Sequence, residues 1–121
     1  MRPIRVVIAD DHAIVRTTLA LLLAEADDVE VIGQAADGAE AVERARELSP
    51  DVLIMDVNMP RMNGIEATRK IATGCPGVKV IGLSMHTTDT LAKEMLRAGA
   101  VGYVPKGTPV RDLLDAIHAV Q

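Results

Sequence analysis

The chain has 121 residues, 49% of them apolar, which suits one compact domain with a hydrophobic core. It carries 13 basic and 17 acidic residues and no run of Lys or Arg, so its net charge of -4 argues against nucleic-acid binding by this segment. Short apolar stretches, the absence of a secretory leader and a single cysteine, Cys75, favour a cytoplasmic protein without a membrane segment or disulfide.

Five short apolar runs, rich in β-branched residues, predict strands. In chain order they are Ile4–Ala9, Val29–Ile32, Val52–Met55, Val78–Leu83 and Val101–Val104. Apolar residues at helical spacing follow each strand and predict five helices. This alternation predicts an α/β fold, a flavodoxin-like doubly wound sheet of five parallel strands in the order 2-1-3-4-5. We expect one domain that covers residues 1–121.

Polar side chains come directly after four of the predicted strands. Asp10 and Asp11 follow the first strand, Asp56 the third, Ser84 the fourth and Lys106 the fifth. The ligand site of such a sheet lies at the carboxyl ends of the strands, where the winding direction reverses. The predicted order places strands one and three side by side there, so the three carboxylates should share one crevice.

Three carboxylates in one crevice require compensation. Like charges about 5 Å apart repel by roughly 3 kcal/mol per pair at an effective dielectric of about 20. A hard cation, a basic side chain or protonation of one carboxyl could relieve this repulsion. Oxygen ligands favour Mg²⁺ or Mn²⁺ over zinc, and Lys106 supplies a fixed positive charge. Two positive charges beside carboxylates suit phosphoryl transfer.

Four segments together resemble the receiver domains of bacterial two-component response regulators. They are IADDHAIVR around Asp10 and Asp11, DVLIMDVNMPRMNG around Asp56, IGLSMH around Ser84, and AGAVGYVPK ending at Lys106. The resemblance runs over essentially the whole chain. It is strongest to regulators whose receiver is joined to a LuxR-type helix-turn-helix output domain that binds DNA.

The resemblance implies that Asp56 is the phosphoacceptor, modified by a sensor histidine kinase or a small phosphodonor. It also implies that Asp10 and Asp11, with Asp56 and the backbone carbonyl of Asn58, hold Mg²⁺. Members of the family catalyse only their own phosphorylation and dephosphorylation, so we do not expect an enzyme with a separate substrate. Asn58 and His86 occupy positions that tune how fast the acyl phosphate hydrolyses.

The resemblance further implies how the modification is recognised. Lys106 and Ser84 would contact phosphoryl oxygens, and the backbone N–H groups of Val57 and Met85 would add donors. Tyr103 matches an aromatic residue that turns inward as the Ser84 hydroxyl moves toward the phosphate. The resulting switch would act through a homodimer, formed by helix four, strand five and helix five or by helices one and five, or through release of the output domain.

Simpler interpretations exist for each residue. Asp10 and Asp11 could cap the first helix, and Ser84 could satisfy a turn. Lys106 could be solvated, and Tyr103 could fill the core with its hydroxyl in water. The three histidines are scattered without metal-ligand spacing, so we interpret them as not catalytic; they are His12, His86 and His118.

One departure from the family pattern lies beside Lys106. Many receivers have proline directly after this lysine, whereas here Pro105 precedes it and Gly107 follows. Proline lacks an N–H and fixes φ near -65°, so we expect an altered backbone at this corner.

Other function classes fit the sequence less well. Phosphatases of the haloacid dehalogenase type carry a second Asp two residues after the nucleophile, where this chain has Asn58. The sequence lacks GxxxxGK[ST] and GxGxxG, so it cannot cradle a nucleotide. A receiver that is never phosphorylated and acts by binding alone is the remaining alternative.

Overall fold

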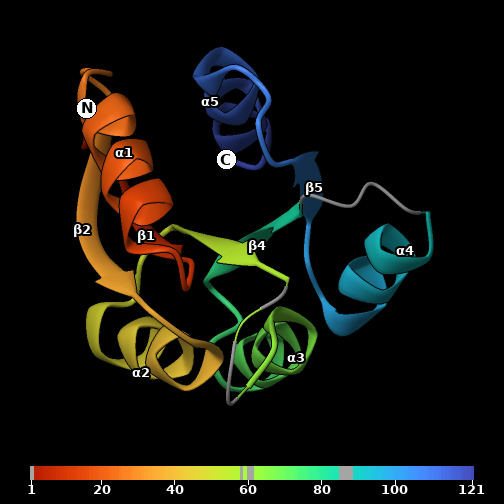
Figure 1. The fold of residues 1–121 in the computed structure, drawn as a ribbon. Coiled ribbons are helices and arrows are strands. Elements are labelled where there is room, and N and C mark those ends of the chain that lie inside the picture. Colours follow the sequence, from red (N-terminus) through yellow and green to blue (C-terminus); the bar gives the residue numbers. More distant parts are fainter. Residues whose placement is uncertain (1, 58, 60–61, 85–88) are drawn as a thin grey trace.

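The computed structural model describes residues 2–57, 59, 62–84 and 89–121. Its strands are β1 (Ile4–Ala9), β2 (Val29–Ala35), β3 (Val52–Asp56), β4 (Lys79–Ser84) and β5 (Gly102–Pro105). Its helices are α1 (Ala13–Ala24), α2 (Gly38–Leu48), α3 (Gly64–Gly74), α4 (Asp89–Ala98) and α5 (Val110–Ala119). All four strand pairs are parallel and the order is β2-β1-β3-β4-β5 (Figure 1), which confirms the predicted fold class.

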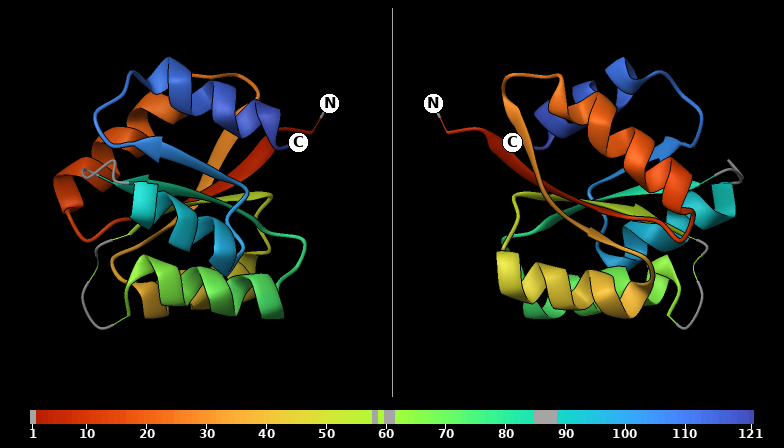
Figure 2. Two further views of the ribbon diagram at one scale, coloured as in Figure 1. Left: turned by 90° about the vertical axis from the view of Figure 1, so that its right-hand side faces the viewer. Right: turned by 60° about the vertical axis from the view of Figure 1, so that its left-hand side comes forward.

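Helices cover both faces of the sheet, and successive strand residues supply the two cores. Val6 and Ile8 of β1 belong to the core beneath α1 and α5, whereas Val7 and Ala9 belong to the core beneath α2, α3 and α4. Figure 2 shows these two helix layers on opposite sides of the sheet. Because both faces are covered, the interior residues of β3 and β4 form continuous apolar runs without polar alternation, and the polar residues of these strands lie at their ends. No helix in the described part of the chain is long and apolar enough to span a bilayer.

The second strand is longer than predicted. The sequence pattern ended it at Ile32, but β2 continues to Ala35. A register shift between Val6 and Val7 lets the last three residues of β2 pair with the end of β1. β2 is an edge strand with no strand beyond it, so it can contain the exposed polar residue Gln34.

β1 has the predicted bounds, whereas β3, β4 and β5 each end one residue later than predicted. Asp56 and Ser84 are the last residues of β3 and β4, where they lie opposite Leu83 and Pro105 respectively. The backbone pairing therefore continues through these polar residues, which the apolar runs alone did not include. As a result, the sheet itself fixes the backbone of Asp56 and Ser84.

A close contact at the start of α3 fixes the backbone that follows Asp56. The Gly64 N–H donates to the Val57 carbonyl at 2.8 Å, and the Asn63 side chain accepts a bond from Glu66 N–H as N-cap. A Cβ atom on Gly64 would lie 2.2 Å from the Asp56 carbonyl oxygen. Only glycine permits this approach, so α3 begins directly against the end of β3.

We predict that Gly64→Ala lowers the free energy of unfolding by about 2 kcal/mol, because the methyl group forces backbone apart at a packed contact. Gly74→Ala, at the other end of α3, is the matched control, because a Cβ there has no neighbour within 4 Å. Urea unfolding followed by circular dichroism measures both. Equal stability of the two variants would contradict the proposed contact.

Candidate functional site

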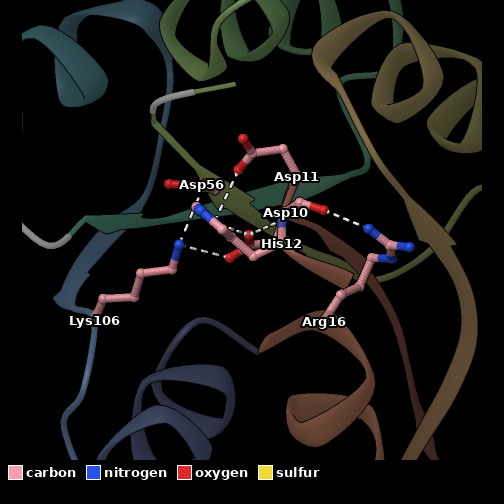
Figure 3. A network of polar contacts seen from close by, with 6 residues as sticks. All are labelled: Asp10, Asp11, His12, Arg16, Asp56 and Lys106. Carbon is pink, nitrogen blue, oxygen red and sulfur yellow. Dashed lines mark hydrogen bonds and ion pairs between the residues drawn. The ribbon is translucent and has the colours of Figure 1, made fainter. Parts of the chain in front are cut away.

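The residues singled out after the strands meet at the carboxyl edge of the sheet. Asp10, Asp56 and Ser84 are buried, and Lys106 follows directly after β5. The Lys106 N–H donates to the Ser84 carbonyl at 2.8 Å, which extends the β4–β5 pairing by one bond. Figure 3 shows the Lys106 side chain reaching from β5 toward the acidic residues that end β1 and β3.

The Lys106 ammonium bridges two buried carboxylates. Its Nζ atom lies 2.7 Å from Asp10 Oδ2 and 3.2 Å from Asp56 Oδ2. Burial lowers the pKa of Lys106, but the two carboxylates outweigh this effect and raise the pKa above its ordinary value of 10.5. Lys106 is therefore a permanent cation at neutral pH, not a solvated surface lysine.

The cluster holds more negative charge than Lys106 neutralises. Carboxylate oxygens of Asp10, Asp11 and Asp56 and a ring nitrogen of His12 all lie within 4.8 Å of one another. Among the described residues, no donor makes a hydrogen bond of acceptable geometry to Asp10 Oδ2; its contact with Lys106 is an ion pair. Closely spaced carboxylate oxygens, one of them lacking a hydrogen bond, form a donor set suited to a hard divalent cation.

Asp10 also shapes the backbone that leads into α1. Its Oδ1 atom accepts a bond from the His12 N–H at 2.8 Å, and the N-cap residue of α1 is His12, without a side-chain cap. The alternative that Asp10 or Asp11 is the N-cap of the first helix is therefore wrong. Arg16 Nη1 donates to the Asp10 carbonyl at 2.7 Å, and its Nε donates to Gln34 Oε1 on β2.

His12 is a site residue that the sequence analysis missed. Its Nδ1 atom lies 3.3 Å from Asp10 Oδ1 and 3.1 Å from Asp11 Oδ1 (Figure 3). The histidines were expected to show no metal-ligand spacing, but His12 lies within 4.8 Å of the three carboxylates, whereas His118 pairs with Asp28 elsewhere; that none of them is catalytic stays a prediction. The position of His12 directly after Asp10 and Asp11 could have indicated that its ring lies near their carboxylates. Arg16, which contacts the Asp10 carbonyl, lies one helical turn after His12.

One predicted backbone donor is already engaged. The Val57 N–H donates to the Leu83 carbonyl at 3.0 Å, so the expectation that it serves the phosphoryl group is wrong for this structure. The cause is the continuation of the β3–β4 ladder past Asp56. The other predicted residues of the two loops, Asn58, Met85 and His86, lie outside the described residues.

Tyr103 and Pro105 occupy the edge strand that carries Lys106. Tyr103 is partly buried against the core that α2, α3 and α4 cover. Pro105 lies opposite Ser84, and a proline is tolerated here because an edge strand has one unpaired side. Gly107 has a positive φ of 90°, which turns the chain after Lys106 toward α5. With this backbone, the Lys106 side chain still reaches the carboxylates of Asp10 and Asp56.

Comparisons with known proteins agree with this geometry. Residues 6–118 match the family model described as the response regulator receiver domain. The response regulator GacA of Pseudomonas viridiflava is 44% identical over 117 residues, which cover 97% of this chain and 55% of that protein. The chain therefore spans about half the length of such relatives.

Two solved structures illustrate the similarity of fold. A two-component response regulator of the LuxR family from Aurantimonas sp. SI85-9A1 has a TM-score of 0.92 and 36% identity, covering 98% of this chain and 84% of that one. CheY in the CheX-CheY-BeF3-Mg²⁺ complex from Borrelia burgdorferi has a TM-score of 0.91 and 27% identity, covering 98% of this chain and 90% of that one.

The ion pairs of Lys106 give a pH-dependent prediction. Lys106→Met should lower the free energy of unfolding by about 3 kcal/mol at about pH 8, because it leaves two buried carboxylates without their cation. Since the folded-state pKa is raised, the contribution of Lys106 is fully present below pH 10.5 and is lost as the pH rises through the folded-state value. Urea unfolding of wild type and variant across the alkaline range measures the difference.

Lys93→Met is the matched control, because Lys93 is exposed on α4 and outside the cluster. It should change stability little at any pH. A Lys106→Met variant as stable as Lys93→Met at about pH 8 would contradict the structural role given to the ion pairs.

Proposed function

The chain belongs to the response regulator receiver family, and on this premise we propose that Asp56 accepts a phosphoryl group and thereby controls an output. The observation that carries the proposal is the buried Asp56 carboxylate at the end of β3, with the Lys106 ammonium 3.2 Å from its Oδ2 atom. A receiver domain of a two-component system is not an enzyme in the usual sense. The reaction proposed here modifies the protein itself.

In the proposed step, an Asp56 carboxylate oxygen attacks phosphorus while the bond to the donor's leaving group breaks and its electrons go to that group. Lys106 would hold one phosphoryl oxygen, because its charge is fixed beside Asp56 before the donor arrives. The hydroxyl of buried Ser84, at the end of the neighbouring strand, would hold another. Little reorganisation is needed, since the sheet fixes the backbone of both residues.

Mg²⁺ is the cation that we propose for the acidic cluster. Asp10, Asp11 and Asp56 would hold it, with the Asn58 carbonyl as a further ligand from outside the described residues. When bound, Mg²⁺ neutralises charge that develops on the phosphoryl oxygens. The Borrelia CheY complex with BeF3 and Mg²⁺ supports this choice, because that domain is a structural relative.

The proposed partners follow from the relatives. A sensor histidine kinase would supply the phosphoryl group, approaching along α1, and a LuxR-type DNA-binding domain would receive the signal in the full-length protein. We propose on this basis that the domain works in the cytoplasm and that residues 1–121 are one module of a transcription regulator. Self-association through α4, β5 and α5 or through α1 and α5 would transmit the signal.

The proposed switch links Ser84 to Tyr103 across the end of the sheet. The two residues lie on adjacent strands β4 and β5, and Tyr103 is partly buried. Movement of the Ser84 hydroxyl toward the phosphoryl group would let the Tyr103 ring turn further inward and alter the α4–β5–α5 face. Asn58 and His86 would set the lifetime of the acyl phosphate.

The proposal predicts a covalent modification. Incubation with acetyl phosphate and Mg²⁺ should add about 80 Da to the intact wild-type protein, as expected for one phosphoryl group. The Asp56→Asn variant and wild type without Mg²⁺ should show no gain by mass spectrometry. A gain that persists in Asp56→Asn would assign the acceptor to another residue, and no gain in wild type would favour a receiver that acts by binding alone.

The excess of negative charge in the acidic cluster predicts a second effect. In the absence of Mg²⁺, the free energy of unfolding of Asp11→Asn should equal that of wild type or exceed it by up to about 1 kcal/mol. The reason is that the substitution removes one repelling charge from a partly exposed position. Millimolar Mg²⁺ should stabilise wild type in thermal unfolding but scarcely affect this variant, since ligands stabilise the state that binds them.

Asp115→Asn is the control for this effect, because Asp115 is exposed on α5. It should leave the Mg²⁺ response unchanged. The same response to Mg²⁺ in Asp11→Asn and in wild type would exclude Asp11 from the cation site.

A further inference from the structure

A groove of about 580 Å³ opens beside the proposed acceptor site, between α1 and the loop that joins β5 to α5. Figure 2 shows α1 and α5 on the same side of the sheet, and the loop lies between them. The groove is lined on one wall by His12, Ile14, Val15 and Leu19 and on the other by Lys106 and Thr108. Most of the surface that lines the groove is apolar.

The groove and the acceptor site share residues. Lys106 lines the groove while its Nζ atom lies 3.2 Å from Asp56 Oδ2. His12 lines it while its ring contacts Asp10 and Asp11. A molecule whose anionic end meets Lys106 therefore has the apolar wall of α1 within reach of its other end.

The apolar wall is exposed and available. Ile14, at the start of α1, is 82% exposed and lines the groove, so a ligand in the groove can contact its side chain. The space is ample for a ring, because a cavity of about 150 Å³ suffices to bind benzene. A deeper recess that shares Val15 and Leu19 has only about 90 Å³, so a ring would occupy the outer groove.

We propose that this groove receives the leaving group of small phosphodonors and makes the domain selective for acyl phosphates with an apolar or aromatic acyl group. The inference rests on the proposed function of Asp56. With benzoyl phosphate, an Asp56 oxygen forms the bond to phosphorus and the bond from phosphorus to the bridging oxygen breaks. Benzoate leaves with the electron pair, so the step needs neither a proton nor a redox partner.

The size of the preference for an aromatic donor follows from the apolar area of the donor that the groove removes from water. Burial of about 50 Å² of a phenyl ring corresponds to a preference of about tenfold over acetyl phosphate. Ile14→Ser should reduce this preference at least about threefold, because it replaces apolar wall by a hydroxyl. Because Ile14 is exposed, Ile14→Ser should leave the fold intact, and thermal unfolding of the variant checks this.

Time courses of intact-mass change with Mg²⁺ give the rate constant for each donor. They are measured for wild type, Ile14→Ser and the control Leu21→Ser, which removes an exposed apolar side chain of α1 outside the groove. For each protein, the rate constant with benzoyl phosphate is divided by the rate constant with acetyl phosphate. Comparing this ratio between the three proteins removes the difference in intrinsic reactivity between the two donors. We expect the ratio to fall in Ile14→Ser and to stay at the wild-type value in Leu21→Ser.

Two negative outcomes are distinguishable. Phosphorylation by both donors with the same ratio in all three proteins would overturn the selectivity and leave the proposed function intact. Failure of both donors to modify wild type would overturn the proposed function and the inference with it.

Discussion

Three carboxylates and one ammonium group meet at the carboxyl edge of the sheet, and their electrostatic balance governs the rest of the structure. Oxygens of Asp10, Asp11 and Asp56 lie within 4.8 Å of one another, and Lys106 contacts the two buried members. One ammonium cannot neutralise three carboxylates, so the site keeps an affinity for further positive charge. A divalent cation and an electron-poor phosphorus atom would both interact favourably with the excess negative charge of the site.

The fold supplies this arrangement through its parallel strands. Asp10 and Asp11 follow β1, Asp56 ends β3 and Lys106 follows β5, so residues as distant in sequence as Asp10 and Lys106 become neighbours. Close packing then fixes their backbone: Gly64 brings α3 against the end of β3, and Arg16 fastens the Asp10 carbonyl to α1. The site is consequently preformed, which reduces the reorganisation that catalysis would require.

The sequence predicted much of this because strand ends and chemistry coincide. Asp56 and Ser84 could be placed at one edge from apolar runs alone, since parallel strands all end on the same side. The length of β2 could not be predicted in this way, because Gln34 on an edge strand needs no apolar pattern. The roles of His12 and of the Val57 N–H depend on a local turn and on one extra ladder bond, which no periodicity encodes.

We propose that Asp56, at this edge of the sheet, carries a phosphoryl group in the activated protein. The most direct test is a crystal structure of the protein with beryllofluoride and Mg²⁺, because beryllofluoride bonded to a carboxylate imitates an acyl phosphate. We expect density joined to an Asp56 carboxylate oxygen, with Lys106 in contact with a fluoride and a cation held by Asp10 and Asp11. Density joined to Asp10 or Asp11, with Asp56 unmodified, would contradict it.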